Sequence, residues 1–136
     1  KDILYGSYVI GQSKCCGTPI AIKTLYRGYI VEVCHGKEKV DFLSENVRRI
    51  HLGAKAPLQD DHFHKDRMDD NSYTVLYYLN PTWKKSWGGH TIVGDEKIEY
   101  KPNRAIIYKS NISHRGIAPK GPSFRTYINY VVDGKK

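Results

Sequence analysis

Short apolar runs separated by turn residues dominate the hydrophobic pattern of this chain. They are rich in Tyr, Val and Ile, and Gly, Pro, Asn and Asp bound them. Such runs predict strands, here over residues 5–10, 19–33, 46–53, 59–66, 73–79, 88–93, 97–101, 105–109, 113–117 and 124–132. Eight of these runs follow residue 46, and eight strands is the number that a double-sheet jelly roll requires. The pattern therefore predicts a mainly β fold.

Helical periodicity is weak along the whole chain. Only Val40 to Ile50 favours a helix, of two or three turns, so we expect one or two supporting helices toward the N-terminus. The 136 residues, of which 40% are hydrophobic, suffice for one compact core and are too few for two domains of usual size. We therefore expect a single domain over residues 1–136.

The charge and cysteine content narrow the class of protein. The net charge of +8 is spread along the chain, and its longest basic clusters are pairs such as Arg48-Arg49. This favours a solvated surface and leaves nucleic acid as a partner only through a folded patch. No run approaches the roughly 18 apolar residues of a membrane span, so we expect no membrane partner. Three cysteines, of which Cys15 and Cys16 are adjacent, favour reduced thiols in a cytoplasmic protein.

A candidate metal site begins in the segment "HFHKD". On a strand, His64 and Asp66 leave the same face, about 7 Å apart along the backbone. His114 follows at the start of a later predicted strand. Two His and one carboxylate form the facial triad that leaves three coordination positions open in non-haem Fe(II) oxygenases. An alternative set uses His62 and His64 with His114, and leaves Asp66 as a bystander.

Arg125 lies eleven residues after His114, in "GPSFRTYINYVV". We expect it on the next strand, antiparallel to the strand of His114. A guanidinium group in that place can form paired hydrogen bonds with a carboxylate that also reaches the metal.

These segments together resemble a known family. In order, "HKD", "YTVLYYLNPTW", "WGG", a His and an Arg are similar to the 2-oxoglutarate and Fe(II)-dependent dioxygenases, specifically the prolyl 4-hydroxylase-like branch. The likeness covers about residues 46–132. It implies a double-stranded β-helix (a jelly roll, cupin-like) over that range, with residues 1–45 as supporting N-terminal elements.

The resemblance also implies site residues and cofactors. His64, Asp66 and His114 would be the catalytic Fe(II) ligands, and Arg125 would pair with the distal carboxylate of 2-oxoglutarate. Tyr78 would donate a hydrogen bond to the same cosubstrate, whereas Tyr77 alternates with it and faces the other side of the strand. The implied cofactors are Fe(II) and 2-oxoglutarate, with ascorbate as a candidate accessory reductant.

The implied reaction is hydroxylation of a C–H bond, in a prolyl residue of a protein or peptide, with release of succinate and CO2. Three departures from the family pattern stand out: His90 replaces a common Glu, Arg125 replaces the Lys of collagen-type enzymes, and Ala54 stands where some relatives have Tyr. The alternatives are an oxygenase for a nucleic acid base or a small metabolite, and a non-catalytic metal-binding jelly roll. Val131, where nucleic-acid dealkylases carry a second Arg, argues against a base as substrate.

Overall fold

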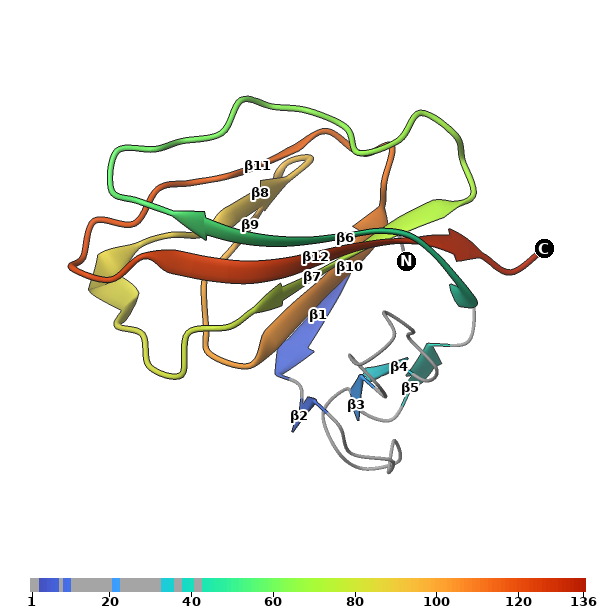
Figure 1. Ribbon diagram of the computed structural model, residues 1–136, viewed down its shortest axis with the longest axis horizontal. Helices are drawn as coiled ribbons and strands as arrows, with labels where there is room; N and C mark the ends of the chain where they lie inside the picture. Colours follow the sequence, from blue (N-terminus) through green and yellow to red (C-terminus); the bar gives the residue numbers. More distant parts are fainter. Residues whose placement is uncertain (1–2, 8, 11–20, 23–32, 36–37, 41–42) are drawn as a thin grey trace.

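Two antiparallel sheets make up most of the computed structural model, which describes residues 3–7, 9–10, 21–22, 33–35, 38–40 and 43–136 (Figure 1). The larger sheet has the strand order β1 (Ile3–Ser7), β10 (Arg104–Lys109), β7 (Ser72–Tyr78), β12 (Arg125–Gly134) and β6 (Leu43–Lys55). The smaller sheet has the order β11 (His114–Gly116), β8 (Thr91–Val93) and β9 (Glu96–Ile98). Two short pairs join β2 (Val9–Ile10) to β3 (Ala21–Ile22) and β4 (Val33–His35) to β5 (Glu38–Val40).

From residue 43 onward the chain passes back and forth between the two sheets. It leaves β6 in the larger sheet, runs beside β11 of the smaller sheet near His64, and returns as β7. It then forms β8 and β9, crosses to β10, crosses back to β11, and ends in β12. This alternation is that of a jelly roll, so the mainly β, jelly-roll prediction is confirmed for this part of the chain.

The alternation of side chains along the central strands divides the apolar residues between two faces. One cluster includes residues of β8 and β9, so it fills the space between the sheets: Leu76, Tyr78, Val93, Ile98, Tyr100, Ile106 and Tyr108. The other lies on the opposite face of the larger sheet: Leu43, Val75, Tyr77, Ala105, Ile107, Tyr130 and Val132. Tyr77 and Tyr78 thus face opposite sides, as their alternation predicts.

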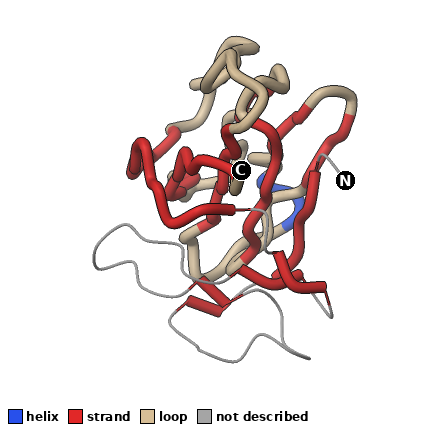
Figure 2. The backbone as a smooth tube through the Cα atoms, turned by 90° about the vertical axis from the view of Figure 1, so that its right-hand side faces the viewer, coloured by secondary structure: helices blue, strands red, loops and turns tan. Residues whose placement is uncertain are grey.

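The helix predicted over Val40 to Ile50 is wrong. The described residues of that range belong to strands, and β6 pairs antiparallel with β12 over most of its length. Ladder hydrogen bonds and the packing of Val47 and Leu43 against the core override a weak local helical tendency. Within the described ranges, the only helix is the three-residue 3-10 turn η1 (Lys85–Trp87), visible in Figure 2 as a single short blue segment. No helix there has the length and apolar character needed to cross a membrane.

The strand predicted over residues 59–66 is also wrong for most of its length. A turn at Ala56 to Gln59 ends β6, and Leu58 has a positive φ of 65°. The segment that follows is tied to β11 at separate points, including a bridge between His64 and His114. It therefore occupies the place of a fourth strand in the smaller sheet without forming a regular ladder.

The other strand predictions that fall on described residues hold with shifted ends. The run 88–93 becomes a strand only from Thr91, because Gly88 and Gly89 both adopt positive φ and form a bend. The run 5–10 is divided between β1 and β2. Most of the run 19–33, together with Cys15 and Cys16, lies outside the described residues.

Candidate metal centre

Three side chains converge at one end of the space between the sheets. His64, Asp66 and His114 each offer a ligand atom, and these atoms lie within 4.8 Å of one another. Two backbone hydrogen bonds, of 3.0 and 2.9 Å, join His64 and His114 in both directions and hold the two imidazoles side by side. The cluster in the described part of the chain contains Asp66 and not His62. The alternative ligand set with His62 therefore lacks the geometry that the set with Asp66 has.

Both imidazoles are oriented by the backbone. Nδ1 of His64 lies 2.8 Å from the carbonyl oxygen of His62, and Nδ1 of His114 lies 2.8 Å from that of Ile112. Because a carbonyl only accepts, each Nδ1 carries the proton, and in the neutral ring each Nε2 keeps its lone pair. This is the tautomer that binds a metal through Nε2.

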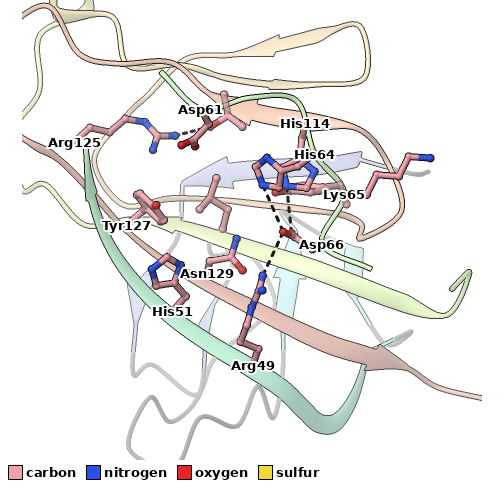
Figure 3. Close-up of a pocket in the computed structure, with 14 residues that line it drawn as sticks. Arg49, His51, Asp61, His64, Lys65, Asp66, His114, Arg125, Tyr127 and Asn129 are labelled. Atoms are coloured by element: carbon pink, nitrogen blue, oxygen red, sulfur yellow. Dashed lines mark hydrogen bonds and ion pairs between the residues drawn. The ribbon is translucent and has the colours of Figure 1, made fainter. Parts of the chain in front are cut away.

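The two Nε2 atoms face the Asp66 carboxylate, as the dashed lines in Figure 3 show. The distances are 3.7 Å from His64 and 3.3 Å from His114. Nε2 of His114 is buried and has no hydrogen-bond partner. A lone pair and a carboxylate held this close repel each other unless a proton or a metal ion stands between them, and ligands about 2.1 Å from an ion stand about 3 Å apart. The donor set and its spacing therefore fit Fe(II) with open positions on one face.

Neighbouring groups fix the Asp66 carboxylate. The buried Thr74 hydroxyl donates to its Oδ2 at 2.7 Å and also lies 2.9 Å from the Ser110 hydroxyl. Nη2 of Arg49 donates to Oδ1 at 3.3 Å. Burial raises the pKa of Asp66, but His114, Thr74 and Arg49 outweigh it and lower the pKa to about 2. The group is therefore an anionic ligand at neutral pH.

A cavity of about 290 Å³ extends from these ligands between the sheets. Figure 3 shows Arg125 at one end and the three ligand side chains at the other. Its lining is mostly polar and consists of Arg49, His51, Asp61, His64, Lys65, Asp66, Leu76, Thr91, Tyr108, His114, Gly116, Arg125, Tyr127 and Asn129.

Arg125 is only 1% exposed. Its Nε donates to the Gly89 carbonyl at 2.6 Å, and its Nη2 donates to the Thr91 hydroxyl at 2.8 Å. No ion pair in the described part of the chain includes Arg125. A buried guanidinium without a carboxylate partner is costly unless an anionic ligand compensates it. This end of the cavity therefore fits a carboxylate.

The strands that pair with the strand of Arg125 differ from those expected from the sequence. Its strand, β12, does not pair with β11, the strand of His114; it belongs to the larger sheet, between β7 and β6. The arginine therefore reaches the cavity from the sheet opposite the metal ligands. The residues between β11 and β12 carry the chain from the smaller sheet to the larger one. The spacing of the predicted strands alone did not reveal this crossing.

Tyr78 lies behind the cavity rather than in its lining. Its hydroxyl shares a 2.6 Å hydrogen bond with the Thr91 hydroxyl, which also accepts from Arg125. Burial raises the pKa of Tyr78, so the phenol stays protonated. Direct donation from Tyr78 to a cosubstrate stays a prediction, whereas its support of Arg125 through Thr91 is visible.

Sequence reasoning assigned no role in the site to Thr74, Thr91, Arg49, Asp61 or Lys55. Thr74 and Thr91 look like ordinary strand residues, and only the packing of strands shows that their hydroxyls meet Asp66 and Arg125. His90 turns away from the metal cavity and lines a smaller cavity of about 100 Å³ with Lys97 and Glu99.

Comparisons with known proteins agree with this geometry. Residues 46–131 match the model of the 2OG-Fe(II) oxygenase superfamily. That range is more than half of the chain, so this chain belongs to the 2OG-Fe(II) oxygenase superfamily. The family implies Fe(II) and 2-oxoglutarate as cofactor and cosubstrate. No curated protein sequence matches the chain.

Solved structures share the fold at low identity. A prolyl-4-hydroxylase from Pseudomonas putida matches with 17% identity and a TM-score of 0.52, covering 64% of this chain and 51% of that one. The viral collagen prolyl hydroxylase from Paramecium Bursaria Chlorella virus-1 matches with 19% identity and a TM-score of 0.54, covering 64% and 58%. A non-heme alpha ketoglutarate dependent carbocyclase from nogalamycin biosynthesis matches with 12% identity and a TM-score of 0.54, covering 65% and 49%. The chain thus spans about half the length of these structures.

Replacing Asp66 with Ala should weaken Mn(II) binding roughly 100-fold or more, because the change removes the only anionic ligand of the cluster. The dissociation constant can be measured by titration calorimetry, with electron paramagnetic resonance as a second readout. Asp70→Ala, in the same loop, is the matched control and should bind as the parent does. Parent-like affinity in Asp66→Ala would exclude this ligand set.

Replacing Thr74 with Val keeps the side-chain shape but removes the hydroxyl that holds Asp66 Oδ2. We expect Mn(II) affinity to fall about tenfold, the usual size of the loss when an outer partner of a ligand is removed. Thr74→Ser keeps the hydroxyl and should restore most of the affinity. Equal affinities in the Val and Ser variants would show that the hydroxyl does not position the carboxylate.

Proposed function

We propose that this chain hydroxylates a prolyl residue of a protein or peptide, using Fe(II), 2-oxoglutarate and dioxygen and releasing succinate and CO2. One observation carries the oxygenase part of this proposal. A His64, Asp66 and His114 cluster stands at one end of a cavity, and a buried Arg125 without a carboxylate partner stands at the other. A ligand that chelates a metal through one end and carries a carboxylate at the other satisfies both ends at once.

The residues at the two ends of the cavity would have separate roles. His64, Asp66 and His114 would hold Fe(II), and when bound the iron and 2-oxoglutarate supply the oxidising chemistry for insertion of oxygen into a C–H bond. Arg125 would bind the distal carboxylate by a charge-assisted hydrogen bond. Thr91 and the Gly89 carbonyl hold its guanidinium in place. Because these partners are buried, little reorganisation is needed when the ligand enters.

The exposure around the metal ligands supports a substrate larger than a metabolite. The His64 side chain is 47% exposed, whereas those of Asp66 and His114 are about 5% exposed. The centre therefore opens to the surface along the loop that follows β6. Phe63, beside His64, is 52% exposed and stacks on Arg115. An exposed aromatic ring on the residue before a metal ligand suits a proline ring of a peptide. The likeness to prolyl hydroxylases favours the same substrate class.

A second candidate function has its own support. Arg49 and Lys65 line the same cavity, and cationic side chains there favour an anionic substrate such as a nucleic acid. We rank it below the peptide because the basic groups do not continue as a long patch in the sequence. A cytoplasmic location, and ascorbate as an accessory reductant, remain parts of the proposal.

Measuring the turnover of 2-oxoglutarate distinguishes the peptide substrate from the nucleic acid substrate. With Fe(II) present, we expect proline-rich peptides to stimulate succinate formation and to gain one oxygen atom, located by mass spectrometry on proline. The same peptides with proline replaced by alanine are the control. Stimulation by oligonucleotides and not by peptides would favour the nucleic acid candidate. Cosubstrate and metal binding without turnover on any substrate would favour a binding module.

Replacing Arg125 with Met should raise the KM for 2-oxoglutarate roughly 10- to 100-fold, because a buried carboxylate would lose its charged donor. Steady-state kinetics of succinate formation measure this change. Arg48→Met, an exposed arginine of β6 that pairs with Asp133, is the control for loss of a positive charge. A KM like that of the control would place the carboxylate anchor elsewhere.

A further inference from the structure

A second buried cation stands beside Arg125. Lys55, the last residue of β6, lies directly opposite Arg125 in the β6–β12 register and is only 4% exposed. Buried lysines are rare unless paired. Its Nζ lies 2.6 Å from Oδ1 of Asp61. Arg125 and Asp61 therefore line the carboxylate end of the cavity, and the buried Lys55 adjoins them.

Asp61 is held in place from two sides. Its backbone N–H donates to the Gly116 carbonyl at 3.1 Å, and its side chain pairs with Lys55. Asp61 also lines the cavity, and Figure 3 shows it between Arg125 and the metal ligands. A ligand that reaches Arg125 therefore passes close to a fixed negative charge.

Gly116 marks the space that these groups share. A Cβ atom there would stand 3.2 Å from Oδ2 of Asp61, 3.2 Å from Cε of Lys55 and 3.3 Å from Nη1 of Arg125. Neither hydrogen bond of Arg125 uses Nη1. Nη1 is thus the donor that remains for a ligand, and it faces the small space over Gly116. Lys55 and Asp61 lie on the other sides of that space.

We propose that the Lys55–Asp61 pair sets the affinity of the site for dicarboxylic 2-oxo acids. Lys55 is a second cationic contact for the distal carboxylate of the ligand, and Asp61 is an internal carboxylate that competes with it. This inference rests on the proposed function, since it assigns further residues to the cosubstrate end of the same cavity. Asp61 lowers affinity in two ways: it repels the incoming carboxylate and it occupies Lys55.

The size of the effect follows from Coulomb's law. A unit charge about 5 Å from the ligand carboxylate, at an effective dielectric constant of about 20, changes affinity by about two orders of magnitude before salt screening. Because the Asp61 side chain is 38% exposed, we expect a change of about tenfold. The effect should vanish for a ligand whose distal end has no charge.

The experiment measures binding without turnover. Mn(II)-loaded protein is titrated under argon with 2-oxoglutarate, and the dissociation constant is read by calorimetry. We expect Asp61→Asn to bind about tenfold more tightly than the parent, and Lys55→Met to bind about tenfold more weakly. Asp95→Asn, in the exposed turn between β8 and β9, makes the same charge change away from the cavity and should match the parent.

Two further arms test the distal charge itself. 2-Oxopentanoate, which has the metal-chelating end but no distal carboxylate, should bind equally to the parent, Asp61→Asn and Lys55→Met. Lys55→Arg retains the cation and should keep the parent affinity, and Asp61→Asn carries the test by itself if Lys55→Met does not fold. Unchanged Mn(II) affinity verifies that each variant keeps the metal centre.

The outcomes distinguish this inference from the proposed function. If Arg125→Met weakens 2-oxoglutarate binding but Asp61→Asn binds no more tightly than Asp95→Asn, the inference is overturned and the proposed function stands. The inference also fails if Asp61→Asn tightens 2-oxopentanoate as much as 2-oxoglutarate. If the parent protein with metal binds no 2-oxoglutarate, both are overturned.

Discussion

The two backbone hydrogen bonds between His64 and His114 are the constraint on which the site depends. They attach an irregular loop to the smaller sheet at the point that carries two of the three candidate metal ligands. A short attachment is sufficient because each imidazole is also fixed through its own Nδ1. The loop can therefore stay irregular on both sides of His64 while the ligand atoms keep their spacing.

The interior of this jelly roll is divided between apolar packing and buried charge. One side of the intersheet space is filled by stacked aromatic rings, including Tyr78 and Tyr100 with centroids 4.1 Å apart. Beside them, Arg125 lies 5.2 to 5.6 Å from three tyrosine rings. These rings stabilise the cation in part but supply no negative charge. The fold thus tolerates an arginine whose full compensation would come from a ligand.

The sequence was sufficient to predict the features that depend on residue type and on neighbouring residues in the chain. Apolar alternation predicted most strands after residue 72, and "HFHKD" with His114 and Arg125 predicted the cavity ends that the structure brings together. It failed at Val40 to Ile50, where pairing with β12 decides the conformation. It failed again at residues 59–66, where a turn after β6 prevents a regular ladder. The first failure concerns hydrogen bonds to a distant segment, and the second concerns a local turn.

By itself, the sequence determined which side chains can hold a divalent ion and a carboxylate, because those abilities belong to imidazole, carboxylate and guanidinium groups. Only the tertiary structure decided which groups stand next to them. Thr74 supports Asp66 because β7 passes beneath it, and Lys55 stands beside Arg125 because β6 and β12 are paired in one register. Such neighbours come from strands far apart in the chain, so no local pattern encodes their contact.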